Sequence, residues 1–241
     1  MKRGACLRAL VIIPAYNEQG SIEQVILGVK NAHPSIDIVV VNDGSTDRTG
    51  EQARRTGMAT VIDLPLNLGI GGAMQTGYMY AKRNGYDIAV QIDGDGQHDP
   101  GELSAIVQEV EAGRCDCCIG SRFLRKTAYQ SSVSRRFGIF FFSWMVQWMT
   151  GVRVTDPTSG FRAANRKVIG LFAEHYPDDY PEVEAVVMLA RRGLGISEMS
   201  VLMHRRAAGR SSITPWKSLY YMFKVSLAVV MTRFRDSGEM R

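Results

Sequence analysis

Residues 88–100 have the sequence Ile-Ala-Val-Gln-Ile-Asp-Gly-Asp-Gly-Gln-His-Asp-Pro, in which an apolar run leads into two carboxylates separated by one glycine. The run predicts a buried strand, which would end just before Asp93 and Asp95. Carboxylate oxygens at this spacing suit a hard divalent cation, Mg²⁺ or Mn²⁺, able to hold the phosphates of a nucleotide diphosphate. A solvated acidic turn is the simpler alternative, but the longer string with Gln97 and His98 favours a metal site.

Strands and helices alternate around this stretch. The expected strands cover residues 7–13, 36–41, 60–64, 88–92 and 115–120. The expected helices cover residues 22–31, with Ser21 as N-cap, and 46–55, 71–83, 101–112 and 185–192. This alternation predicts an α/β fold, a mostly parallel sheet flanked by helices and joined by right-handed crossovers. Ligands of such sheets bind beyond the carboxyl ends of the strands, where the polar clusters 16–18, 42–47 and 93–99 fall.

Two segments, residues 117–155 and 199–235, contain basic and apolar residues but no acid. Each includes an expected amphipathic helix, one at about residues 131–150 and one within residues 214–241. Such surfaces are typical of contact with an anionic membrane. Nucleic acid is not expected as a partner, because the runs are too apolar for a wet, polar groove. Core packing or a partner subunit would also explain the helices, so a homo-oligomer remains an alternative.

The composition fits one large domain with an extension. The 241 residues are 45% hydrophobic and carry a formal charge of +5. We expect a domain over residues 1–213 and an amphipathic extension over residues 214–241. No apolar stretch reaches the roughly 18 residues of a spanning helix, and no signal peptide is evident. These features predict a cytoplasmic protein, peripheral on the inner face of the cell membrane, with reduced, buried cysteines.

Three successive motifs resemble those of family 2 glycosyltransferases in order and spacing: residues 11–18 (Val-Ile-Ile-Pro-Ala-Tyr-Asn-Glu), 39–47 (Val-Val-Val-Asn-Asp-Gly-Ser-Thr-Asp) and 93–98 (Asp-Gly-Asp-Gly-Gln-His). Residues 156–162, Asp-Pro-Thr-Ser-Gly-Phe-Arg, narrow the resemblance to the branch similar to dolichyl- and polyprenyl-phosphate sugar transferases. The resemblance covers about residues 7–213. It implies the GT-A fold, a nucleotide-sugar donor, a divalent metal, Mg²⁺ or Mn²⁺, and inversion at the anomeric carbon.

The resemblance also implies roles for individual residues. Those expected to bind the nucleotide or donor are Pro14, Tyr16, Glu18, Asp43, Asp93, Arg122, Arg206 and Ser212. Those expected to bind the metal are Asp93, Asp95 and Gln97. Ser212 departs from the pattern, because related sequences often have a lysine there, and Arg210 is placed to compensate. Asp47 is either part of the donor motif or a helix cap.

The expected acceptor is a membrane lipid such as polyprenyl phosphate, whose phosphate would meet Arg125, Arg135 or Arg136. Its oxygen is already anionic and needs no protein base. An acceptor hydroxyl, as on a lipid-linked saccharide in envelope polysaccharide assembly, would instead need a carboxylate, and Glu184 and Asp156 are the candidates. With Asp95 they form the expected catalytic set. A nucleotide-sugar-binding protein without catalysis is the alternative from another class. The donor sugar and its base stay open.

Overall fold

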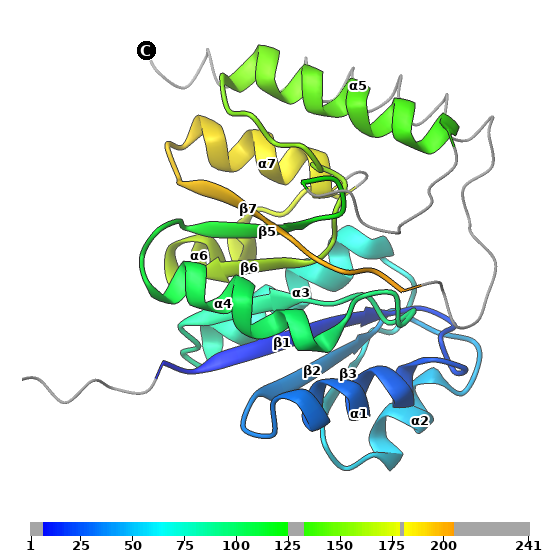
Figure 1. Cartoon of the computed structure of the whole chain (residues 1–241). Coiled ribbons are helices and arrows are strands. Elements are labelled where there is room, and N and C mark those ends of the chain that lie inside the picture. Colours follow the sequence, from blue (N-terminus) through cyan, green and yellow to red (C-terminus); the bar gives the residue numbers. More distant parts are fainter. Residues whose placement is uncertain (1–6, 125–132, 179–180, 205–241) are drawn as a thin grey trace, which may run out of the picture.

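The computed structural model describes residues 7–124, 133–178 and 181–204 (Figure 1). Its strands are β1 (Ala9–Ala15), β2 (Asp37–Asn42), β3 (Thr60–Asp63), β4 (Ile88–Gln91), β5 (Cys117–Ser121), β6 (Arg162–Asn165) and β7 (Ile196–Ser200). Its α-helices are α1 (Ile22–Ala32), α2 (Thr49–Arg55), α3 (Gly69–Arg83), α4 (Leu103–Glu111), α5 (Val133–Thr150), α6 (Arg166–Glu174) and α7 (Pro181–Arg191). A single 3₁₀ turn, Pro100–Glu102, precedes α4.

The strands form one sheet in the order β3-β2-β1-β4-β6-β5-β7. All described pairings are parallel except those of β6, which runs antiparallel to both β4 and β5. The predicted α/β fold with a mostly parallel sheet is therefore confirmed. The sequence did not predict β6, β7 or α6. Because β6 is reversed, the turn that precedes it lies at the edge of the sheet where β4 ends.

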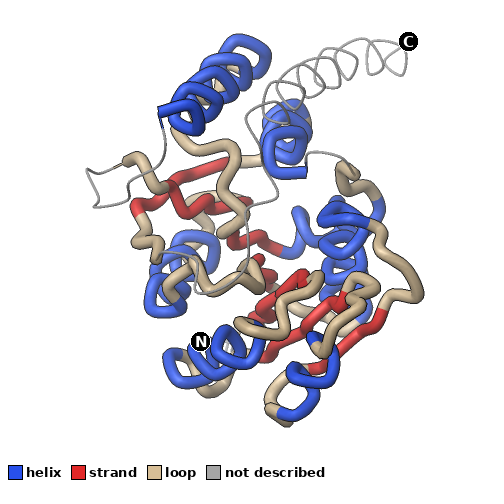
Figure 2. Tube along the Cα trace, turned by 90° about the vertical axis from the view of Figure 1, so that its right-hand side faces the viewer, coloured by secondary structure: helices blue, strands red, loops and turns tan. Residues whose placement is uncertain are grey.

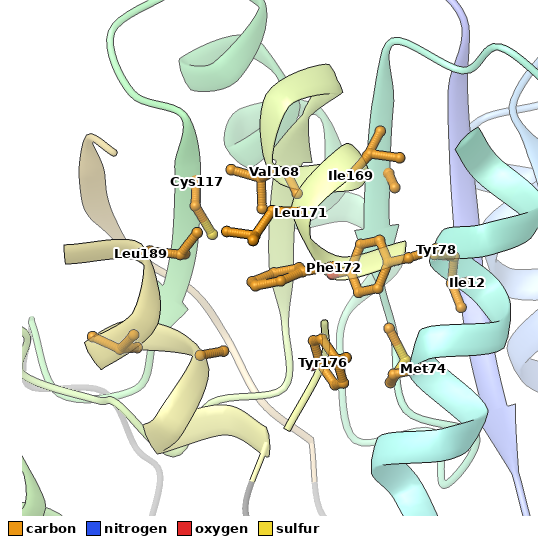
Figure 3. Close-up of a cluster of buried hydrophobic side chains, with 14 of the residues drawn as sticks. Ile12, Met74, Tyr78, Cys117, Val168, Ile169, Leu171, Phe172, Tyr176 and Leu189 are labelled. Carbon is orange, nitrogen blue, oxygen red and sulfur yellow. The ribbon is translucent and has the colours of Figure 1, made fainter. Parts of the chain in front are cut away.

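Helices cover both faces of the sheet (Figures 1 and 2). Core residues of α1, α2 and α4 pack on one face. Those of α3, α5, α6 and α7 pack on the other. At the centre of the second layer the rings of Tyr78, Phe172 and Tyr176 lie with centroids 4.9–5.4 Å apart (Figure 3). Burial of these large side chains stabilises the contact of α3 with α6.

Helix α3 approaches its neighbours closely because two of its positions are glycine. A Cβ on Gly71 would lie 2.4 Å from the Pro177 carbonyl oxygen. A Cβ on Gly77 would lie 2.3 Å from Cγ2 of Ile12 on β1. Both distances are too short for a real contact, so Gly77 sets how near α3 lies to the sheet and Gly71 how near it lies to the segment after α6.

Helix α5 has one buried and one exposed apolar face. Ile139, Phe142, Met145 and Val146 are buried, whereas an aromatic stripe stays 56–71% exposed: Phe137, Phe140, Trp144 and Trp148. The Trp144 and Trp148 rings stack with centroids 6.3 Å apart. The expected helix at about residues 131–150 is confirmed. In the described part of the chain no helix has both the length and the apolar character needed to span a bilayer. The second expected amphipathic helix, within residues 214–241, falls outside the described residues.

Ser21 occupies the N-cap position of α1, as expected, but its side chain does not act as the cap. Ser21 makes no capping hydrogen bond to the helix. Its hydroxyl instead donates to a carboxylate oxygen of Glu18 at 2.8 Å. The serine therefore steadies the loop after β1, which belongs to the candidate site.

Candidate donor and metal site

The carboxyl ends of β1 and β2 are tied together by their loops. The Asp43 N–H donates to the Ala15 carbonyl at 2.9 Å. Asn17 has a left-handed backbone, with φ of 55°. Its side-chain oxygen accepts from the Thr46 N–H at 2.9 Å, and its own N–H donates to the Ser45 hydroxyl at 3.0 Å. Asparagine tolerates this conformation better than most residues, which explains its place between Tyr16 and Glu18.

The predicted nucleoside-binding residues gather at this edge, with different surroundings. Pro14 is buried, Glu18 is half-buried and Tyr16 is 46% exposed, so its ring is open to a stacking partner. Asp43 is 3% exposed, and its oxygens accept from the N–H groups of Leu68 and Gly69 at 2.7 and 2.9 Å. Asp43 thus holds the start of α3, and base recognition by it stays a prediction.

Asp47 has a structural role. Its carboxylate accepts from the Thr49 N–H at 2.9 Å and from the Gln19 N–H at 3.2 Å. The first bond satisfies a backbone donor at the start of α2, and the second ties that start to the loop after β1.

The loop after β4 carries Asp93 and Asp95, with Gln97 two residues further on. The Asp95 side chain is 7% exposed and accepts from the Gln97 N–H at 3.0 Å, so the loop folds around it. The Asp93 carboxylate is 38% exposed at the same edge. In residues 7–124, 133–178 and 181–204, no group of three His, Cys, Asp or Glu side chains is arranged to hold a metal ion.

His98 supports Asp93 through a hydrogen bond from the Asp93 backbone. Its Nδ1 accepts from the Asp93 N–H at 3.2 Å, which places the ring proton on Nε2, 3.7 Å from the Asp93 carboxylate. The imidazole is 4% exposed and stacks on the Phe161 ring, with centroids 5.1 Å apart. The histidine therefore orients a candidate metal ligand.

The turn before β6 presses against the same carboxylate. A Cβ on Gly160 would lie 2.9 Å from an Asp93 oxygen and 3.0 Å from the Gln91 side-chain nitrogen. Only glycine fits there without moving Asp93. The motif at residues 156–162 contains this turn, but nothing in the sequence indicates that the turn contacts the loop of Asp93 and Asp95, here called the metal loop.

Arg122 and Asp156 form a buried ion pair beside this turn. Arg122 is 4% exposed and Asp156 is fully buried. Arg122 donates from Nε and Nη2 to the two Asp156 oxygens at 2.6 and 2.7 Å. Its backbone N–H also donates to Asp156, at 3.1 Å, and its Nη2 donates to the Thr158 hydroxyl at 2.8 Å. A bidentate pair of this kind fixes the guanidinium plane.

Glu198 on β7 supports the pair from the other side. Its carboxylate accepts from the N–H groups of Thr155 and Asp156 at 2.7 and 2.9 Å, and from the Thr155 hydroxyl at 3.0 Å. Burial raises the pKa of Glu198, while these hydrogen bonds act against the increase. Glu198 was not predicted as a site residue, because a single acid on a short strand forms no recognisable sequence motif.

The two acids at the start of α7 differ in what surrounds them. Successive helical residues are turned by about 100°, so Glu182 and Glu184 lie about 200° apart around the axis. The pKa of Glu182 is raised above its ordinary value. Burial is the main cause and the charge of Asp93 adds to it, whereas the positive charge of Arg162 acts in the opposite direction. Glu182 thus lies in the electrostatic field of the metal loop. Glu184, the acid chosen from sequence, is half-buried on another side of the helix.

Several predicted residues fall outside the described part of the chain: Arg125, Arg206 and Ser212, and the side chain of Arg135. Arg136 is described and is exposed on α5. The last described residues, 201–204, do reach the site, because the His204 N–H donates to the Gln97 carbonyl at 2.8 Å. His204 Nε2 also lies 3.3 Å from an Asp99 carboxylate oxygen.

Comparison with known proteins agrees with this geometry. The sequence profile of glycosyl transferase family 2 matches residues 10–170. Polyprenol monophosphomannose synthase of Mycolicibacterium smegmatis is 31% identical over 228 residues, which cover 91% of this chain and 86% of that protein. Undecaprenyl-phosphate mannosyltransferase of Micrococcus luteus is 30% identical over 86% of this chain and 88% of its own length.

Solved structures show the same fold. Glucosyl-3-phosphoglycerate synthase of Mycobacterium tuberculosis, in complex with Mn²⁺, UDP-glucose and phosphoglyceric acid, superposes with a TM-score of 0.73 at 22% identity, covering 94% of this chain and 79% of that one. Mannosyl-3-phosphoglycerate synthase of Rubrobacter xylanophilus gives a TM-score of 0.71 at 19% identity, over 98% and 76%. The predicted GT-A fold is confirmed. This chain belongs to glycosyl transferase family 2, in the branch similar to polyprenyl-phosphate sugar transferases, and is a glycosyltransferase.

Proposed function

We propose that the protein transfers a sugar, with inversion, from a nucleotide-sugar donor to a polyprenyl phosphate at a membrane surface. The observation that carries the proposal is the meeting of Asp93, Asp95 and the buried Arg122–Asp156 pair at one edge of the sheet. The relatives named for polyprenol and undecaprenyl-phosphate mannose transfer support the acceptor class.

The described residues fit a divalent cation bound together with the donor. Asp93 and Asp95 offer carboxylate oxygens, the ligands that Mg²⁺ and Mn²⁺ prefer, and Gln97 is a third candidate. Mg²⁺ sites of this kind use one or two carboxylates and take their other ligands from substrate phosphates and water. When bound, such an ion neutralises charge that develops on the departing diphosphate.

The protein's own residues would do the remaining work. Tyr16 packs on the base, and Arg122 faces the diphosphate or sugar with its orientation fixed by Asp156. His98 keeps the Asp93 carboxylate turned toward the metal. An acceptor phosphate is already a nucleophile, so binding it in line with the anomeric carbon suffices. Basic side chains serve that binding, and the candidates are Arg125, Arg135 and Arg136.

The test of the donor site replaces one carboxylate at each end of β4. Asp95→Asn should lower the turnover of nucleotide sugar with Mn²⁺ and polyprenyl phosphate by orders of magnitude, because it removes a ligand charge. Asp87→Asn, at the opposite end of the strand and paired with Arg166, is the control and should keep its turnover. Near-wild-type turnover of Asp95→Asn would show that the metal assignment is wrong. A thermal-shift panel of nucleoside diphosphates with and without Mn²⁺ identifies the donor base.

A second candidate function is transfer to the hydroxyl of a lipid-linked saccharide. The observation that favours it is that burial raises the pKa of Glu182, because a carboxylate with a raised pKa is a stronger base than an ordinary one. Of the two bases predicted from sequence, Asp156 already binds Arg122 through both oxygens, which leaves Glu184. The structure adds Glu182 as a further candidate. Glu182→Gln and Glu184→Gln should each leave transfer to a phosphate within a few-fold of wild type. A large loss of kcat in either variant, with a pH profile that loses its acidic limb, would favour a hydroxyl acceptor.

We also propose that the exposed aromatic stripe of α5 contacts an anionic membrane on the cytoplasmic side. Tryptophans are favoured at membrane interfaces. Arg136 on α5 and Arg153 after it are exposed, and α5 contains no acid. Trp144→Ser with Trp148→Ser should weaken flotation with anionic liposomes at least about tenfold, since burying one such ring contributes about 1.5–3 kcal/mol. Met79→Ser, at an exposed apolar position of α3, is the control. Equal flotation of both variants would mean that α5 meets a partner subunit instead.

A further inference from the structure

Arg162, the first residue of β6, is a buried cation that binds the turn at residues 156–160 through two hydrogen bonds. It is 1% exposed, and it donates from Nε to the Ser159 carbonyl at 2.7 Å and from Nη2 to the Pro157 carbonyl at 2.8 Å. Only arginine has two donors in a rigid fork that can hold two carbonyls at once. The turn between residues 156 and 160 is therefore held from inside the protein.

This arrangement is unfavourable for stability alone. In the described residues no carboxylate lies within ion-pair distance of Arg162, and its buried Nη1 has no hydrogen-bond partner. Gln91, which faces Arg162 in the β4–β6 register, also has a buried oxygen without a partner. The charge of Arg162 acts on Glu182 from beyond ion-pair distance, and burying a charge with no directly paired carboxylate costs several kcal/mol, so packing alone does not account for this residue.

The turn that Arg162 grips contacts the donor site at two points. Asp156 and Thr158, at one end, bind the Arg122 guanidinium. Gly160, at the other end, lies against the Asp93 carboxylate. A shift of the turn would move both groups relative to each other.

We propose that Arg162 is a positioning residue for sugar transfer. By holding the carbonyls of residues 157 and 159 it fixes the distance between Arg122 and the metal-binding Asp93. The proposal rests on the function proposed above for those two residues. It assigns Arg162 no contact with substrate.

Arg162→Lys tests the two hydrogen bonds to the turn, because lysine keeps the charge but cannot bind two carbonyls in the same geometry. We expect kcat to fall about tenfold to a hundredfold, the scale of a misplacement of about 1 Å, and the Mn²⁺ concentration for half-maximal activity to rise. The KM for the acceptor should stay within twofold. Phe172→Leu, a core change in α6, controls for lost stability and should lower Tm without changing these constants. Arg162→Lys with kcat and the Mn²⁺ constant within twofold of wild type would overturn the proposal.

Gly160→Ala tests the same turn in case Arg162→Lys fails to fold. Its Cβ would displace the Asp93 carboxylate, so the Mn²⁺ constant should rise at least about fivefold, while Gly170→Ala, with open space around it, should leave it unchanged. An unchanged constant in Gly160→Ala would overturn the coupling of the turn to Asp93. Arg122→Met separates the two proposals. If it keeps full activity, the proposed donor site is wrong. If it is inactive and Arg162→Lys is fully active, only the role of Arg162 is wrong.

Discussion

Replacing Asp156 by asparagine would break the buried ion pair while leaving its shape almost unchanged. Asparagine keeps one carbonyl oxygen near Arg122, but it removes the negative charge and one of the two acceptors at 2.6 and 2.7 Å. The guanidinium, 4% exposed, would then stay charged without a counter-ion. Arg122 cannot escape this by losing its proton, because an arginine side chain remains charged in proteins.

The expected loss of stability is large. Removing one partner of a buried pair costs about 3–5 kcal/mol. In a chain of this size each kcal/mol lowers Tm by about 2–4 °C, so Asp156→Asn should lower Tm by about 6–20 °C. The exposed pair of Lys82 and Glu174, 2.7 Å apart with side chains 48% and 63% exposed, provides the comparison. Glu174→Gln should change Tm far less than Asp156→Asn, because solvent screens an exposed pair.

The assay is thermal unfolding of both variants in one buffer, together with the double variant Arg122→Met, Asp156→Leu. Removing both charges should recover much of the lost stability but no activity, because the donor loses its arginine. A Tm for Asp156→Asn within about 2 °C of wild type would refute the reasoning. Asp156 would then have no essential partner in the folded state, and its predicted role as a base would become the better account.

Three further outcomes follow from single side chains. Burial raises the folded-state pKa of Glu182 above its ordinary value of 4.5, so Glu182 destabilises the fold little at acid pH and more as pH rises above 4.5. The Tm advantage of Glu182→Gln over wild type should therefore widen from pH 4 to 7, and a constant difference would contradict this. Gly77→Ala should cost about 1–3 kcal/mol in urea unfolding, because its Cβ would overlap Ile12; wild-type stability would show that α3 can shift. Tyr78→Phe removes a buried hydroxyl without a partner and should not lower Tm, whereas a fall would reveal a bond to that group.

Sequence periodicity predicted the elements whose signal is local. The apolar strands β1 to β5 and the helices α1 to α5 were found with ends shifted by at most three residues, and the polar clusters lie at the carboxyl edge as expected. Strand β6 was missed because it has only four residues, begins with an arginine, and follows a motif that resembles a loop. Its reversed direction depends on pairing with β4 and β5, which no local pattern contains.

The site was predicted in its residue types more than in its contacts. Asp93 and Asp95 stand out because two carboxylates follow an apolar strand. The partnership of Arg122 with Asp156 joins residues 34 positions apart, and sequence alone gave them separate roles. The choice of Glu184 over Glu182 rested on alignment with a family motif. Which acid lies near the metal loop depends on the rotation of α7 about its axis, which packing sets.

The Arg122–Asp156 pair also joins the two ends of a segment, residues 122–156, that contains the whole of α5. Glu198 on β7 holds the second end of this segment through a hydrogen bond from the Asp156 N–H. Because the pair fixes the two ends of this segment to each other, a change within the segment reaches the candidate donor residues through the pair and through the packing of α5 on α7. The exposed face of α5 can therefore change in composition with little effect on the pair.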